Sequence, residues 1–115
     1  MKQHKTLTAR QEALFERNLY AAVLTLRTED ECKAFFRDLC TPAEIQALAD
    51  RWAVVEPLQR ALPYREIYRS TGVSVTTIGR VARYLASGNG GYNLASQRLA
   101  GHRTDTARSA PGNSR

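Results

Sequence analysis

The chain has few of the side chains that small enzymes and metalloproteins use for chemistry. Of its 115 residues only two are histidine and two cysteine, and the histidines, His4 and His102, lie near the ends. No Cys/His, Ser/His or paired-carboxylate arrangement has usable spacing, so we expect neither an enzyme nor a metal site nor a bound cofactor. Cys32 and Cys40 lie among apolar residues, which predicts buried, reduced thiols in a cytoplasmic protein.

Long apolar runs are also missing. No stretch reaches membrane-spanning length, and the opening residues "MKQHKTLTARQE" lack the apolar run of a signal peptide. We therefore expect no membrane segment. The hydrophobic fraction of 43% is still enough for the core of one compact domain.

Acidic residues are outnumbered, with 11 Asp+Glu against 17 Lys+Arg and a formal net charge of +6. Residues 28–63 carry seven acidic and four basic residues, whereas residues 64–85 carry four arginines and one glutamate. A basic segment directly after an acidic one indicates a face that meets an anionic partner, such as nucleic acid.

Apolar periodicity predicts an all-α fold. Over residues 8–26 the apolar side chains recur at helical spacing and form a stripe that is broad for one neighbour. Such a stripe suggests burial on two sides, and hence a dimer; the alternative is the central helix of a monomer. The stripe consists of Leu14, Phe15, Leu19, Tyr20, Ala22, Val23, Leu24 and Leu26.

Two further helix starts carry the pattern of a capping box, in which a hydroxyl side chain and a glutamate three residues later satisfy each other's backbone N–H groups. Thr28 pairs with Glu31 in this way, and Thr41 with Glu44. The sequence therefore predicts helices that begin after Thr28 and after Thr41.

The third helix is expected over residues 41–62, with an interruption at Pro57. Proline lacks an N–H, and its ring crowds the carbonyl of Ala53 four residues earlier. We predict either a kink or an early stop of the helix.

The ends of the chain differ from its middle. "GNGG" at residues 88–91 predicts a helix stop or a short loop. Residues 101–115 are polar and unpatterned, which predicts a disordered basic tail, solvated rather than bound to phosphate. With a flexible N-terminus at residues 1–7, the folded domain is expected over residues 8–100.

Residues 64–87 hold two helical patterns joined by a very short connection. Ile67 anchors the first helix, Gly72 can adopt a positive φ at the turn, and Ser74 is a good N-cap for the second helix. This layout is typical of a helix-turn-helix. The apolar face of the second helix consists of Ile78, Val81, Ala82 and Leu85.

The opposite face of that second helix is polar and basic. On a helical wheel Thr76, Arg80 and Arg83 lie opposite Ile78, with Thr77 at the flank. The N-terminal turn of such a face contacts base edges in the major groove. Threonine and arginine suit that role, since their methyl, hydroxyl and guanidinium groups bind bases or phosphates.

Arg65 and Arg69, one turn apart on the first helix, would contact the phosphate backbone. Gly79 is unusual inside a helix, where it costs about 1 kcal/mol relative to alanine. It would permit the close approach of DNA or of another helix, and the sequence does not choose between them. Tight two-helix turns also occur in proteins that bind only other proteins, so a protein-interaction module without sequence-specific DNA binding is the alternative.

Three blocks occur together and in order: "DLCTPAEIQALADRWAVVEPL", "YREIYRSTGVSVTTIGRVARYL" and "GNGGY". Over residues 8–95 they resemble the Trp-repressor superfamily, in particular its YerC/YecD-type branch. The resemblance implies a Trp-repressor-like helical bundle in an intertwined homodimer. It also implies a transcriptional regulator of the repressor type, whose two helix-turn-helix units occupy successive major grooves of a double-stranded operator.

The resemblance assigns roles to single residues. Val75, Thr76 and Thr77 match the groove-facing start of the reading helix, and Arg65 matches a phosphate contact. Tyr68 replaces a basic residue, so one backbone contact is expected to be lost. The full predicted DNA-binding set is Arg65, Arg69, Ser74, Val75, Thr76, Thr77, Arg80 and Arg83.

In the Trp repressor, tryptophan is the corepressor and is held between two arginines. Arg51 and Arg80 match these positions, and Thr41 matches a residue that lines the pocket. Val81 replaces a glycine and Tyr84 a small serine, and both add bulk where an indole needs room. We therefore expect another small effector, or none, in place of tryptophan.

Overall fold

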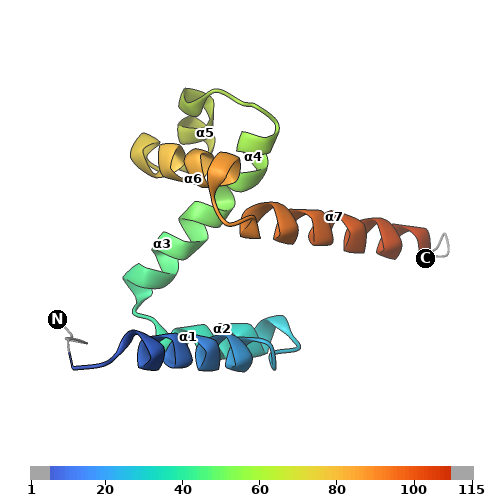
Figure 1. Cartoon of the computed structure of the whole chain (residues 1–115). Helices are drawn as coiled ribbons and strands as arrows, with labels where there is room; N and C mark the ends of the chain where they lie inside the picture. Colours follow the sequence, from blue (N-terminus) through green and yellow to red (C-terminus); the bar gives the residue numbers. More distant parts are fainter. Residues whose placement is uncertain (1–5, 110–115) are drawn as a thin grey trace. The chain divides into compact units, whose positions relative to one another are not determined.

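The computed structural model describes residues 6–109, and for residues 103–109 it describes the backbone only. All regular elements in this part of the chain are α-helices, which confirms the predicted all-α class (Figure 1). The chain divides into two compact units, residues 1–45 and 46–115. The helices are α1 (Ala9–Val23), α2 (Glu29–Leu39), α3 (Pro42–Ala53), α4 (Val55–Gln59), α5 (Tyr64–Thr71), α6 (Val75–Ser87) and α7 (Gly91–Ser109).

The helix starts in the first unit agree with the predicted caps, with one difference. The Thr41 N–H donates to Glu44 Oε1 at 2.8 Å, and the Glu44 N–H donates to Thr41 Oγ1 at 3.1 Å, a complete capping box. Thr28 Oγ1 likewise accepts from the Glu31 N–H at 3.1 Å. The Glu31 carboxylate, however, accepts from the Arg27 N–H at 2.8 Å. Glu31 therefore accepts from the N–H of Arg27, whereas the capping-box pattern predicts the N–H of Thr28.

The predicted stripe on α1 is not covered within the chain. Neither α1 nor α2 contains a buried residue, and Phe15 and Tyr20 are more than half exposed. Within the first unit, α1 is therefore not a buried central helix.

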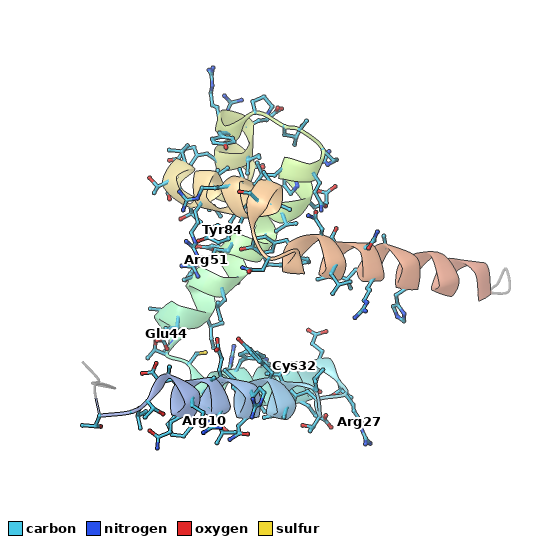
Figure 2. All side chains as sticks on the ribbon, viewed as in Figure 1. Arg10, Arg27, Cys32, Glu44, Arg51 and Tyr84 are labelled. Atoms are coloured by element: carbon cyan, nitrogen blue, oxygen red, sulfur yellow. The ribbon has the colours of Figure 1, made fainter. Side chains whose placement is uncertain are left out.

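The two cysteines are free, as predicted, but their burial differs from the prediction. Cys40 is half-buried, whereas Cys32 is exposed on α2 (Figure 2). Burial of a thiol needs a neighbouring element on that side of the helix, and this chain leaves α2 without a buried residue. Periodicity marks the apolar residues but does not show whether the same chain covers them.

The expected third helix is two helices, and the early stop at Pro57 is confirmed. The helix α3 ends at Ala53, and Val54 adopts φ −95° and ψ 0° before α4 begins. Pro57 is the third residue of α4, where a backbone N–H would have no partner within the helix. The break therefore spares both the missing donor and the clash with the Ala53 carbonyl.

The second unit has a core of its own, built around α6. This helix contacts α4, α5 and α7, and burial of each aliphatic side chain contributes about 1.5–3 kcal/mol. The fully buried residues come from four segments that surround the tight turn, so the core holds the two-helix unit as one body. They are Val54, Val55, Ile67, Val73, Ile78 and Val81, with Leu58, Leu62, Leu85 and Tyr92 packed against them.

The helix α6 ends where glycines were expected to stop it, and α7 begins at Gly91. This last helix then extends to Ser109 and leaves the core as a long rod (Figure 1). Residues 101–109 are thus helical, which differs from the predicted disordered tail. The physical reason is that elongation of an existing helix adds one hydrogen bond per residue, and residues 91–110 contain no proline. Residues 110–115 and 1–5 lie outside the described part.

Candidate nucleic-acid interface

The connection between α5 and α6 has the geometry of a helix-turn-helix. Gly72 adopts φ +78°, as predicted, and its N–H donates to the Tyr68 carbonyl at 2.8 Å. The Thr71 hydroxyl donates to the Ile67 carbonyl at 2.7 Å and accepts from the Val73 N–H at 3.1 Å. An apolar residue is commoner at position 71, but here the hydroxyl itself closes the turn.

Ser74 caps α6 with a hydroxyl that both accepts and donates a hydrogen bond. Its Oγ accepts from the Thr77 N–H at 3.2 Å and donates to Thr77 Oγ1 at 3.1 Å. Thr77 is half-buried, and its hydroxyl contacts the cap. Ser74 therefore acts first on the turn, and the Thr77 hydroxyl keeps its proton and one lone pair for a ligand.

The exposed face of α6 agrees with the helical wheel. Thr76, Arg80 and Arg83 are exposed, while Ile78 and Val81 are fully buried. The side chain of Val75, in the first turn, is 54% exposed. The helix contains no acidic residue, so its positive charge is not balanced along its own length.

The arginines of α5 are exposed as well. Arg65 and Arg69 lie one turn apart, and no ion pair among the described residues involves either of them. By contrast, Arg60 of α4 pairs with Glu56 at 2.8 Å. Both helices of the motif thus present guanidinium groups that are available to an anion.

Tyr84 contacts both arginines of α6. The Arg80 guanidinium carbon lies 4.6 Å from the centre of the Tyr84 ring, and that of Arg83 lies 5.4 Å from it. The sequence marked Tyr84 by its bulk and by its place at the flank of the polar face, and not by a contact with the arginines. The spacing of Arg80 and Tyr84, one turn apart on a helix, is a signal that could have revealed the contact.

A surface hollow of about 350 Å³ lies where α6 meets the start of α7. Its walls are Arg80, Tyr84, Asn89, Gly90, Gly91 and Tyr92. The start of α7 is held in place there by Asn93, whose amide donates to the Leu85 carbonyl at 3.3 Å, and by the Trp52 ring, 6.3 Å from that of Tyr92.

The three predicted effector residues come from both units of the chain. Thr41 belongs to the first unit and its hydroxyl caps α3. Arg51 is half-buried on α3 and does not line the hollow that Arg80 lines. Val81 packs in the core, with no exposed surface. The bulk that Val81 adds therefore lies in the core, whereas the Tyr84 ring lies beside Arg80.

Within residues 6–109, no helix is both long and apolar enough to cross a membrane. No group of three or more His, Cys, Asp or Glu side chains in that part of the chain is arranged to hold a metal ion.

Comparison with known proteins places this geometry in a family. The family model described as Trp repressor protein matches residues 16–100, which include all of α2 to α6. The chain belongs to the Trp repressor family. The uncharacterised protein YerC of Bacillus subtilis (strain 168) is 40% identical over 89 residues, which cover 77% of this chain and 86% of YerC.

Two solved structures share the Trp repressor fold of this chain. A TrpR-like protein from Eubacterium eligens ATCC 27750 is 39% identical, with a TM-score of 0.67, and the match covers 85% of this chain and 96% of that one. A candidate Trp repressor from Staphylococcus aureus is 38% identical, with a TM-score of 0.71, and covers 87% and 96%. The predicted resemblance is confirmed.

Proposed function

We propose that this Trp repressor family member is a sequence-specific DNA-binding regulator that represses transcription by occupying an operator. The observation that carries the proposal is the exposed face of α6. Thr76, Arg80 and Arg83 lie on its solvent side, in a helix without acidic residues. In helix-turn-helix proteins the start of the second helix enters the major groove.

The side chains of the motif divide into two roles. Val75 and Thr76, exposed in the first turn of α6, would contact base edges, where methyl and hydroxyl groups discriminate between bases. Arg65 and Arg69 would bind phosphates, which positions the protein without reading the sequence. Ser74 holds the first turn in shape and so supports both roles.

We propose further that the chain acts as an intertwined homodimer. None of α1, α2 and α3 buries a residue within the chain, and monomeric proteins rarely leave so many large apolar side chains in water. A second copy would cover them and place two motifs about one helical turn of DNA apart. The exposed apolar residues outside the helix-turn-helix include Leu14, Phe15, Leu19, Leu39, Leu48, Trp52, Leu94 and Leu99.

Tryptophan is not required in this proposal. The Arg80 guanidinium carbon already lies over the Tyr84 ring, 4.6 Å from its centre, where an indole would need room. A small effector of another kind, if there is one, would have to bind elsewhere or displace Tyr84.

The test is selection of genomic DNA fragments by the purified protein at about 0.15 M salt. The expected result is a two-fold symmetric motif with half-sites about one helical turn apart. The same selection with Thr76→Ala is the matched control, and it should return a motif with relaxed preference in each half-site. Recovery of unrelated fragments by both proteins would overturn sequence-specific binding.

The alternative function is docking on another protein through the same motif. The observation in its favour is the exposure of Tyr64, Tyr68 and Val75, whose side chains are 44%, 53% and 54% exposed. Salt separates the two functions. Binding to DNA releases counterions and weakens steeply as salt rises, whereas docking through apolar side chains does not.

A further inference from the structure

The ring of Tyr84 lies in contact with two positive groups that would otherwise repel each other. Arg80 precedes it by one turn and Arg83 by one residue, and their guanidinium carbons are 4.6 Å and 5.4 Å from the ring centre. An aromatic face attracts a guanidinium at this distance through its quadrupole, and arginine also stacks on it by its flat surface. One ring thus restrains two long side chains.

No other group in the described residues competes for these arginines. Neither forms an ion pair there, and α6 contributes no carboxylate. A guanidinium in a salt bridge would have to leave its partner before it bound a phosphate. A guanidinium on an aromatic ring keeps its N–H donors, which lie in its plane and at its edge, free for a phosphate.

The Tyr84 ring lies in space that Gly88 leaves open at the end of α6. A Cβ atom at residue 88 would lie 3.0 Å from Cδ2 of Tyr84 and would clash with the Tyr84 carbonyl oxygen. The Gly88 N–H donates to that same carbonyl at 2.9 Å, which ends α6. The glycine therefore provides the space in which the Tyr84 ring lies against the end of its helix.

The ring also separates two hollows on the surface. One, of about 350 Å³, is lined by Arg80 and Tyr84 together with the start of α7. The other, of about 170 Å³, is lined by Arg83, Tyr84 and Ser87. Each hollow has one of the two arginines in its wall, so the two guanidinium groups border different hollows.

From these four observations we propose that Tyr84 is a positioning residue that holds Arg80 and Arg83 ready for the DNA phosphate backbone. The inference rests on the proposed DNA-binding function. Binding otherwise orders long arginine side chains at an entropic cost, and the aromatic ring meets part of that cost in the free protein. The aromatic face is the required feature, and the phenol hydroxyl is not.

The experiment measures binding of a fluorescein-labelled, mixed-sequence duplex of about 30 base pairs at about 50 mM KCl. Fluorescence anisotropy is recorded for the parent protein, Tyr84→Phe and Tyr84→Leu. Phenylalanine keeps the aromatic face, so its affinity should stay within about twofold of the parent. Leucine keeps apolar bulk without the face, and its affinity should fall about tenfold, as expected when two side chains are no longer ordered in advance.

A double-mutant cycle separates positioning from a general effect on the fold. In a protein that already carries Arg80→Gln and Arg83→Gln, the further change Tyr84→Leu should alter affinity by less than about twofold. The ring-current shifts of the Arg80 and Arg83 side-chain protons, measured by NMR without DNA, should persist in Tyr84→Phe and vanish in Tyr84→Leu.

The outcomes distinguish this inference from the function on which it rests. If the parent protein binds the duplex and Tyr84→Leu binds equally well, the positioning role is wrong and the DNA-binding function stands. An equal loss with and without the two arginines would also overturn the positioning role. If the parent protein does not bind the duplex at all, the DNA-binding function fails and this inference fails with it.

Discussion

The hydroxyl of Ser74 donates to Oγ1 of Thr77 and at the same time accepts from the Thr77 backbone N–H, at 3.1 and 3.2 Å. This double contact joins the turn of the motif to the first turn of α6. It uses two of the three hydroxyls in residues 74–77, and it leaves Thr76 as the exposed hydroxyl of that turn. The order and stability of the reading helix therefore depend on a polar pair at its start.

Loss of the Ser74 cap should destabilise the protein. We expect Ser74→Ala to lower the free energy of unfolding by about 1 kcal/mol, because the Thr77 N–H loses its acceptor. Ser74→Asp should restore stability, since aspartate caps well and suits the helix dipole. The same aspartate should weaken DNA binding, because it places a carboxylate near phosphates. Urea denaturation and duplex binding measure the two effects, and equal stability of all three proteins would contradict the cap.

Loss of the Thr76 side chain and loss of the Arg65 side chain should change DNA binding in different ways. Thr76→Ala should reduce discrimination between the selected motif and a variant base pair by about 1 kcal/mol, with little change on mixed-sequence DNA. Arg65→Ala should weaken binding to every duplex and make the salt dependence shallower by about one phosphate contact. Competition binding at several salt concentrations tests both. Unchanged binding by both variants would show that neither side chain faces DNA.

Gly79 tests whether α6 is approached closely from outside. A Cβ atom built at residue 79 meets only Cε2 of Tyr64, at 3.9 Å, which is ordinary contact. We expect Gly79→Ala to raise the free energy of unfolding by about 0.5–1 kcal/mol, since alanine is the better helix former. The chain itself has room for the added methyl group. We also expect weaker DNA binding, because the methyl group would hinder the close approach of DNA. Stronger stability with unchanged DNA binding would remove Gly79 from the interface.

The apolar face of α1 should hold the dimer together. Phe15 is 55% exposed in the single chain, so Phe15→Glu should place a charge in the proposed subunit contact and prevent dimerisation. Arg17→Glu, on the opposite side of α1, is the matched control and should leave the dimer intact. Sedimentation equilibrium gives the mass of each protein. A parent protein that sediments as a monomer would refute the homodimer.

Tryptophan should not stabilise the protein. A specific ligand at a hundredfold excess over its Kd would add about 2.7 kcal/mol to the free energy of unfolding. With the Tyr84 ring at 4.6 Å from the Arg80 guanidinium, we expect no change in thermal unfolding or in DNA affinity on addition of L-tryptophan. A saturable rise in the unfolding temperature would show that an indole displaces the ring.

The local features of the fold could be predicted from the residues because they depend on near neighbours. Each of these features acts within one turn of the chain: the cap by a hydroxyl three residues before a backbone N–H, the glycine at a left-handed position, and the proline that crowds a carbonyl. The capping box of Thr41, the positive φ of Gly72 and the end of α3 before Pro57 were all predicted for this reason. The exposed face of α6 followed from its period alone.

Other features depended on groups that approach each other only in the folded chain. Ala61 adopts a left-handed φ of 63° between α4 and α5, although alanine has no local preference for it. Cys32 is exposed on a helix that has no buried residue. The helical state of residues 101–109 depends on the helix that precedes them.

For the candidate site, charge and helical spacing were sufficient to place Arg80 and Arg83 on one exposed face. The structure added the direction of their side chains, which depends on contacts within α6 and at its end. The end of α6 at Gly88 leaves room for the Tyr84 ring, and the ring in turn contacts both guanidinium groups. Periodicity records which side of a helix a residue occupies, whereas the orientation of a long side chain depends on what has packed beside it.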